Sequence, residues 1–475
     1  MTIHCKTLIL AIITTIAGSL FGLFLTRILL FFSSSEYWPA FLIMVALAAL
    51  LIAPLLAALI KKCFDPFEPI YLWIVIYTFL YLAKPLVQIL KSEPFRYGGE
   101  FINEALGLAI IGLIFFYLGY YGSFVKKIAG WLPVIKSPIS SRKLNIVAWI
   151  FITVGFLGLN NYIQTSGGWQ TFWSKPHGLA GQALKTTAYI YQLPELMVIG
   201  FLLIYEVFIH KIIVEKKSVK LTNVIALIMA SIGGVGIYTI IWGSRTLYSW
   251  IIISMVVLYF LKKEKRPKLK TAILTIVLLF LILNFVPFYR SNLYIGGDFS
   301  KTFKNHTLLD ILGGAFNSTD EFNSYLAEVA LVPNSVPYDN FNLYGRFLLH
   351  PIPRLIWPNK PAFLNSKWDE FLAKSGIGWG SAETILGDFY AQKGIWAIIF
   401  GTFLSGIFWR TIYEYLRRNF QNRSVTILYA IILPNMFTYL SQSALIALLK
   451  WFPYMVPGTL IALFLSREKK NALPK

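Results

Sequence analysis

Apolar runs of about twenty residues recur along almost the whole chain and are separated by short polar segments. A helix of about 20 residues spans the roughly 30 Å of hydrocarbon in a bilayer. On this criterion the pattern predicts about twelve transmembrane helices, and the fold class is an all-α polytopic membrane protein. The predicted helices are 7–32, 39–60, 70–90, 105–125, 144–163, 188–212, 221–242, 247–261, 271–289, 395–413, 424–446 and 451–466.

One segment between these runs, residues 290–394, is too long for a simple turn. Within it, Ser318 and Glu321 form a capping-box pattern that predicts a helix through Leu331. A later stretch contains four prolines that exclude a long helix, Pro351, Pro353, Pro358 and Pro361. We therefore expect three parts: transmembrane helices 1–9 in 1–289, one large loop in 290–394, and helices 10–12 with a tail in 395–475.

The composition agrees with a membrane protein. The chain is 57% hydrophobic and 14% charged, with a mean hydropathy of +0.63, whereas soluble domains are about 45–50% apolar and about 25% charged. The formal net charge of +21 lies mainly in short loops between the apolar runs. This distribution follows membrane topology and not one basic face, so we expect no nucleic-acid partner.

Lysine and arginine alternate between rich and poor loops along the chain, which predicts its orientation. Residues 126–143, 211–220 and 262–270 are strongly basic, as is 410–423. Cytoplasmic loops carry the excess of positive charge. We therefore expect a multi-pass protein of the bacterial inner membrane, with both termini in the cytoplasm and 290–394 in the periplasm.

No metal or nucleotide motif occurs: the chain has no Walker A sequence, no HExxH and no CxxC. We expect no cofactor. The large loop instead holds a cationic stretch, Tyr344 to Pro361, that contains Arg346, His350, Arg354 and Lys360. Guanidinium groups bind phosphate oxygens in a bidentate way. The alternative is that these cations meet lipid headgroups or pair with acidic residues of the same loop.

Two further signals lie at predicted helix ends. Arg245, in Trp242-Gly243-Ser244-Arg245-Thr246, joins two apolar runs, and its charge either faces a cavity or snorkels to the interface. Lys84 and Glu195 stand beside prolines inside predicted helices and either pair with each other or meet substrate.

Two carboxylates, Glu383 and Asp388, precede the predicted helix 395–413. Either could act as a general base. The alternative for both is helix capping and pairing within the loop.

These short motifs, taken together, resemble the oligosaccharide repeat-unit polymerases, the Wzy-type O-antigen polymerases. The resemblance consists of Gly243-Ser244-Arg245 between two helices, the pattern Pro-Arg-x-x-Trp-Pro-x-Lys-Pro at 353–361, and Gly-Asp-x-Tyr-x-x-x-Gly at 387–394. It covers roughly residues 240–410 and the predicted topology. It implies a GT-C-like, membrane-embedded glycosyltransferase that transfers undecaprenyl-pyrophosphate-linked glycans at the periplasmic face.

The resemblance also implies roles for the candidate residues. The leaving pyrophosphate would be stabilised by cations, for which the candidates are Arg245, Arg290, Arg346, Arg354 and Lys360. The general base would be His350, Glu383 or Asp388, with His350 ranked first because imidazole titrates near neutral pH. Expected partners are the lipid-linked glycans, membrane lipids and a chain-length regulator. Two other functions stay open, an O-antigen ligase and a polysaccharide flippase or transporter.

The orientation gives a first testable prediction. A reporter that is active only outside the cytoplasm should be active when fused after Asn317, because positive charge retains the strongly basic loops in the cytoplasm and leaves 290–394 on the other side. The same reporter at the C-terminus should be silent. The reverse activity pattern would contradict the predicted topology.

Overall fold

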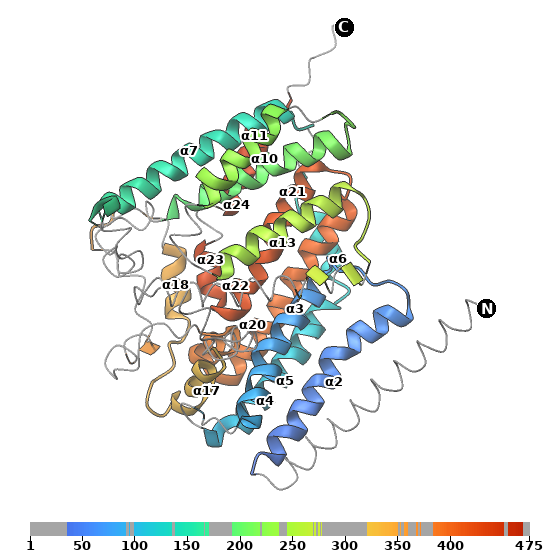
Figure 1. Ribbon diagram of the computed structural model, residues 1–475. Helices are drawn as coiled ribbons and strands as arrows, with labels where there is room; N and C mark the ends of the chain where they lie inside the picture. Colours follow the sequence, from blue (N-terminus) through green and yellow to red (C-terminus); the bar gives the residue numbers. More distant parts are fainter. Residues whose placement is uncertain are drawn as a thin grey trace, which may run out of the picture.

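The computed structural model describes residues 36–91, 95, 99–134, 138–165, 167–170, 192–218, 221–236, 245–268, 270–271, 274–275, 277, 321–349, 352, 356–359, 367–368, 371, 383–450 and 455–468 (Figure 1). Throughout this part of the chain the secondary structure is helical, apart from one isolated β-bridge between Ile139 and Arg467. The predicted all-α class is confirmed for these residues.

Seven helices of the described part are long and apolar enough to cross a membrane. They are α2 (Trp38–Ile60), α3 to α4 (Pro69–Leu90), η2 with α5 (Gly99–Tyr120), α7 (Ser141–Thr165), α10 (Glu195–Ile213), α20 (Ile385–Arg418) and α21 to α22 (Arg423–Ser441). Three shorter apolar helices accompany them, α11 (Leu221–Met229) with the π-helical η4 (Ala230–Gly236), α13 (Arg245–Lys262) and α24 (Val456–Leu465). The chain is thus a membrane protein by helix length and composition. The predicted helix 7–32 and nearly all of 271–289 lie outside the described residues.

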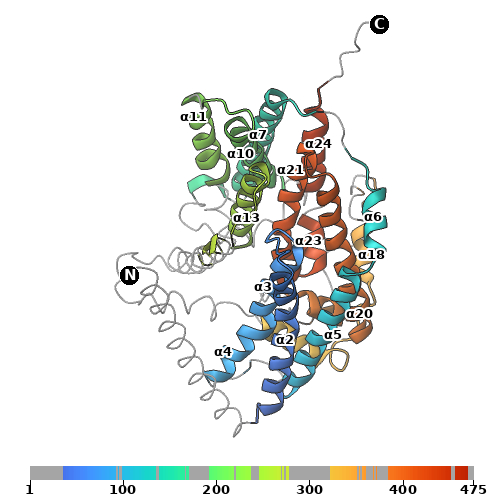
Figure 2. The same cartoon turned by 90° about the vertical axis from the view of Figure 1, so that its right-hand side faces the viewer.

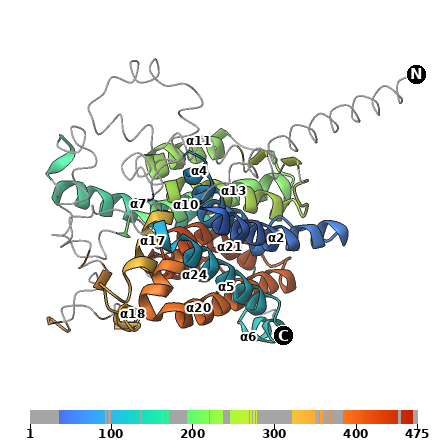
Figure 3. The same ribbon diagram turned by 90° about the horizontal axis from the view of Figure 1, so that it is seen from below.

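Successive helices run in alternating directions, so their connections gather at two ends of the bundle (Figures 1 and 2). We call one the basic end; it holds α6 (Val125–Trp131) and the connections at 61–68, 214–218, 263–268 and 419–422. We call the other the loop end; it holds α17 (Glu321–Leu331), α18 (Asn342–Leu349), α23 (Ala444–Lys450) and the start of α20. Seen from below, α17 and α18 lie beside the first part of α20 (Figure 3).

The pairing of α5 with α20 depends on glycines. A Cβ added to Gly119 would collide with the backbone carbonyl of Phe403, and one added to Gly406 would collide with that of Phe116. Small residues allow membrane helices to approach until their backbones touch. The two helices therefore pack closely along their length, and α20 is fixed against the bundle.

Close to the loop end, α20 is broken. Lys393 has φ −159° and ψ 31°, and Gly394 has φ 63° and ψ −145°, so neither residue is helical. A side chain at Gly394 would be strained at this positive φ and would also contact Tyr338. The predicted helix 395–413 is confirmed, because the part of α20 that follows the break covers it completely. The predicted loop 290–394 is wrong at its C-terminal end, because Ile385–Gln392 forms a separate helical arm.

The backbone of the large loop satisfies the groups that this break exposes. The carbonyls of Ala391 and Gln392 accept hydrogen bonds from the N–H groups of Asp339 (3.0 Å) and Asn340 (2.9 Å). The Gln392 side chain accepts a third from the Phe341 N–H, at 3.0 Å. In lipid, every backbone polar group needs an internal partner. The loop and the arm are therefore parts of one hydrogen-bonded unit.

The predicted helix 424–446 is also interrupted. Pro434 lies in a 3₁₀ turn between α21 (Arg423–Ile432) and α22 (Met436–Ser441). Proline lacks the N–H that a continuous helix needs. A second interruption follows at Ser443, whose φ is 84°, and α23 begins after it. These interruptions place the start of α23 next to α20, as described below.

Ion pairs anchor α20 near the basic end. The Arg410 guanidinium bonds to Glu68, which precedes α3, and to Glu414 on its own helix. The Tyr413 hydroxyl donates to Asp65, at 2.8 Å. These contacts join the last turns of α20 to the connection between α2 and α3.

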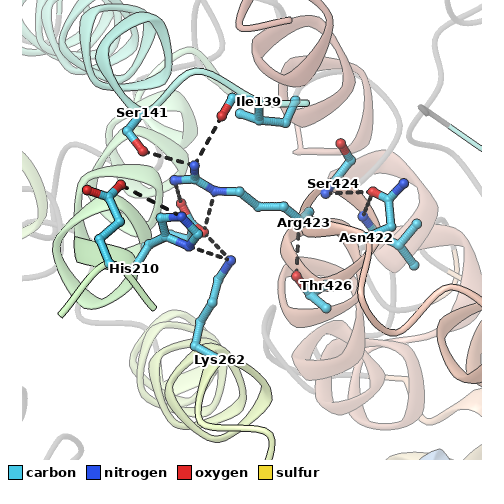
Figure 4. A network of polar contacts seen from close by, with 11 residues as sticks. Ile139, Ser141, His210, Lys262, Asn422, Arg423, Ser424 and Thr426 are labelled. Atoms are coloured by element: carbon cyan, nitrogen blue, oxygen red, sulfur yellow. Dashed lines mark hydrogen bonds and ion pairs between the residues drawn. The ribbon is translucent and has the colours of Figure 1, made fainter. Parts of the chain in front are cut away.

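A buried ion cluster joins three more helices (Figure 4). Glu206 of α10 is fully buried and accepts bonds from Lys262 of α13 at 2.6 Å and from Arg423 of α21 at 2.8 and 2.9 Å. The same guanidinium donates to the Ser141 hydroxyl and to the Ile139 carbonyl, at 2.9 and 3.2 Å. Two cations around one buried carboxylate, with further acceptors for their N–H groups, meet the requirement that buried charges be paired.

Replacement of Glu206 by Gln should strongly destabilise the protein, because Lys262 and Arg423 would keep their buried charges without a carboxylate. Removal of one partner of a buried ion pair costs about 3–5 kcal/mol. The midpoint of thermal unfolding in detergent measures the effect. The control is Glu215→Gln, which removes a pair with the exposed Lys217 and should cost about 0–1 kcal/mol. Equal, small shifts for both variants would contradict the proposed anchoring.

Candidate functional site

The short arm of α20, Ile385–Gln392, forms the centre of the loop end. It begins at Thr384, whose hydroxyl oxygen accepts a hydrogen bond from the Gly387 N–H at 3.2 Å. Threonine is a favoured N-cap because its oxygen satisfies an amide of the first turn. Asp388 follows in that first turn and is 2% exposed. The positive end of the helix dipole favours a carboxylate there.

Asp388 is held by donors from three elements. The Tyr344 hydroxyl of α18 donates to its Oδ2 at 2.7 Å, and the Gln392 amide donates to its Oδ1 at 3.4 Å. The backbone N–H groups of Ala444 and Leu445 donate to the same carboxylate. Because these are the first amides of α23, Asp388 caps that helix from another part of the chain. The carboxylate therefore joins α18, α20 and α23.

Tyr344 contacts Asp388 and lies within electrostatic range of Glu383. Its removal from water raises its pKa well above the usual value, and the negative charges of Asp388 and then Glu383 act in the same direction. The hydroxyl thus keeps its proton and remains a donor to Asp388. Glu383 is half-buried just before the arm, and Arg346 is half-buried in the last turn of α18. Glu383, Asp388 and α18, the helix that contains Arg346, therefore lie close together in the structure.

Glu383 also lines a small pocket between the large loop and the arm. Asp339, Lys367, Trp368 and Gln392 contribute its polar and aromatic side chains. The Lys367 ammonium donates to the Tyr338 carbonyl at 2.8 Å. Trp368 is buried, and its indole N–H has no hydrogen-bond partner within the described part of the chain. The pocket thus combines a cation, carboxylates and an unused donor.

The sequence interpretation missed Glu328. This residue of α17 is fully buried, and its carboxylate fills the space beside Gly387, where a Cβ would overlap it. It follows Tyr325 by three residues, on the face that α17 turns to the bundle. An acidic residue on the buried face of a capped helix was the signal that could have identified it. Its charge lies beside the positive end of α20.

Contacts with α4 and α5 fix α17 in this position. The Tyr325 hydroxyl donates to the Ala105 carbonyl at 2.9 Å, and its ring meets that of Tyr81 edge to face at 5.5 Å. The Gln88 amide donates to the Asn323 side chain at 3.4 Å. The predicted helix through Leu331 is confirmed, and it is part of the bundle instead of a separate loop structure.

Several predicted site residues are placed only in part. Arg245 begins α13, at the predicted junction between two apolar runs, and its backbone alone is described. Lys84 and Glu195 are both buried, at the starts of α4 and α10, and their mutual ion pair stays a prediction. The remaining candidates lie outside the described residues: Arg290, His350, Arg354 and Lys360.

Among the residues that are described, no group of three or more His, Cys, Asp or Glu could hold a metal ion.

The contact between Gly387 and Glu328 gives a specific prediction. Gly387→Ala should lower the midpoint of thermal unfolding, because overpacking costs about 1–3 kcal/mol and displaces the buried carboxylate. The matched control is Gly107→Ala in α5, where an added Cβ meets no atom within 4 Å. That change should raise the midpoint slightly, since alanine is favoured over glycine in helices by about 1 kcal/mol.

A second substitution separates this contact from other causes. Glu328→Ala on the Gly387→Ala background makes room for the added methyl group, so part of the lost stability should return. Additive losses in the double variant would show that the two residues do not interact in this way.

Comparisons with known proteins do not assign a family to this chain. No protein-family model, no curated protein and no solved structure matches it. Its function is therefore inferred from the residues at the loop end and from the short motifs that they belong to.

Proposed function

We propose that this protein is a membrane-embedded glycosyltransferase that polymerises undecaprenyl-pyrophosphate-linked oligosaccharide repeat units into a surface polysaccharide such as O-antigen. The reaction would take place at the loop end, on the periplasmic face of the bacterial inner membrane. The all-α membrane architecture and the motifs of residues 240–410 support this proposal.

The main support for the proposal is that hydrogen bonds join the large loop to the arm of α20. The arm contains Gly387, Asp388 and Tyr390, and the break after it contains Gly394; together these are the residues of the Gly-Asp-x-Tyr-x-x-x-Gly motif. Hydrogen bonds from 339–341 and from Tyr344 hold the loop against it. A loop that is bonded to a helix at the membrane border can position a glycan beside its lipid carrier.

The chemistry would proceed without a nucleotide, because the donor already carries its leaving group. A hydroxyl oxygen of the acceptor sugar bonds to the anomeric carbon of the donor, and the bond from that carbon to the pyrophosphate oxygen breaks. The pyrophosphate leaves with the electron pair, and the hydroxyl proton passes to a base. Arg346, together with Arg245, Arg290, Arg354 and Lys360, would stabilise the leaving group.

Two of the three proposed bases differ in their surroundings. Asp388 is enclosed and holds several donors, which suits a positioning role for the helices around it. Glu383 is half-buried just before the arm, so a substrate hydroxyl can reach it more easily than it can reach Asp388. We therefore rank Glu383 above Asp388 as the base, and His350, which the sequence ranked first, remains a candidate.

Purified protein with synthetic lipid-linked repeat units tests this function. The wild type should form a ladder of products that differ by one repeat unit. Glu383→Gln should slow turnover by about 10²-fold or more while substrate binding is retained, because a general base contributes about 10²–10⁴-fold. Arg346→Ala should also lose activity, and Arg346→Lys should restore little, since an ammonium does not reproduce the guanidinium fork.

Glu100→Gln is the matched control, because Glu100 is an exposed carboxylate at the same end of the bundle and should tolerate the change. Failure of the wild type to join repeat units would contradict the polymerase. Transfer of preformed polymer to a lipid acceptor would instead indicate a ligase. Movement of intact lipid-linked units across a vesicle membrane, without new glycosidic bonds, would indicate a flippase.

A further inference from the structure

An apolar groove lies along the part of α20 that follows the break. It has a volume of about 1000 Å³ and is lined by residues of α6, α20, α21, α23 and α24. Ligand pockets in proteins span roughly 300–1,000 Å³, so the groove can take a sizeable molecule. α21 packs against both α20 and α24 and forms its floor with residues such as Val425 and Leu428.

The sides of this groove face the region of the bilayer. Leu404 and Phe408 of α20 are 60% and 41% exposed, and Ile461 and Phe464 of α24 are 53% and 60% exposed. Large apolar side chains that are exposed on membrane-spanning helices contact lipid hydrocarbon. The molecules next to the opening are therefore hydrocarbon chains.

Polar atoms without partners gather at one end of the otherwise apolar groove. The Thr411 and Ser424 hydroxyls are buried, and neither has a hydrogen-bond partner in the described part of the chain. The same holds for the Nε of Arg467, which follows α24. Buried polar groups are normally hydrogen-bonded, and each exception requires an explanation. All three residues lie toward the basic end, where the headgroups of one leaflet would be.

The charges at this end select the kind of headgroup. The Arg467 guanidinium lies over the Phe464 ring, 4.4 Å from its centroid, so its position at the edge of the groove is fixed. The exposed Lys143 ammonium donates to the Arg467 carbonyl at 2.8 Å, so a second cation lies close to the Arg467 backbone. Two cations with two hydroxyls form a suitable set of donors for a phosphate group.

We propose that this groove binds an anionic phospholipid, with its acyl chain between α20 and α24 and its phosphate at Arg467. The lipid fills the apolar volume and supplies acceptors to Arg467, Ser424 and Thr411. Because α20 also carries the arm of the candidate site, the bound lipid supports the helix on which that site is built. The binding itself is independent of the proposed glycosyltransferase activity.

Native mass spectrometry of the purified full-length protein tests this site. Phosphatidylglycerol and phosphatidylcholine with identical acyl chains are titrated separately. The wild type should bind phosphatidylglycerol more tightly, and Arg467→Gln should weaken that binding about tenfold, as expected for loss of a hydrogen bond to a charged group. Arg142→Gln, at an exposed arginine of the same end that does not line the groove, should bind like the wild type.

A second variant tests the acyl-chain position. Leu428→Trp fills the floor of the groove and should weaken binding of both lipids, whereas Ile150→Trp, on the exposed face of α7, should weaken neither. The proposal is overturned if Arg467→Gln binds phosphatidylglycerol as tightly as the wild type. It is also overturned if Leu428→Trp binds both lipids normally while its thermal midpoint shows that it is folded. A wild type that binds neither lipid would overturn it as well, because another protein surface would then cover the groove.

Discussion

The architecture of the loop end depends on the break in α20 at Lys393 and Gly394. A helix interrupted near a membrane leaves carbonyl and amide groups that hydrocarbon cannot satisfy. In this protein the backbone of 339–341 supplies the missing partners, so the large loop is bonded to the bundle through its main chain. The break also turns the arm that carries Asp388, which in turn satisfies the first amides of α23. One backbone interruption thus positions the loop, the arm and a second broken helix.

Buried carboxylates are stabilised in different ways at the basic end and at the loop end. At the basic end, Glu206 is surrounded by Lys262 and Arg423, and neutralisation by full ion pairs joins α10, α13 and α21. At the loop end, Asp388 is held by hydrogen-bond donors, and it lies with Glu328 near the positive end of a helix. Ion pairs between buried residues fix helices relative to one another. Hydrogen bonds from neutral donors instead fix the position of the Asp388 carboxylate.

The sequence predicted most of the described membrane helices because each needs only about 20 consecutive apolar residues, which is a local property. Prediction failed where a helix was interrupted or extended by distant contacts. Ile385–Gln392 contains polar residues and reads as loop, yet it is helical because 339–341 and Thr384 satisfy its ends. Glu328 was missed for a similar reason, since its importance comes from Gly387, which is far away in the chain.

The sequence by itself therefore determined the class of protein, the approximate borders of most of the described helices, and a helix through Leu331 in the long segment between membrane helices. It also identified Glu383 and Asp388 as a neighbouring pair of acids, because they are five positions apart. The tertiary structure alone decided which of them is enclosed, which helices each one contacts, and where an apolar groove ends in unsatisfied donors. Hydrophobicity and helix length are encoded locally, whereas hydrogen-bond partners and burial are set by residues that lie tens to hundreds of positions apart in the chain.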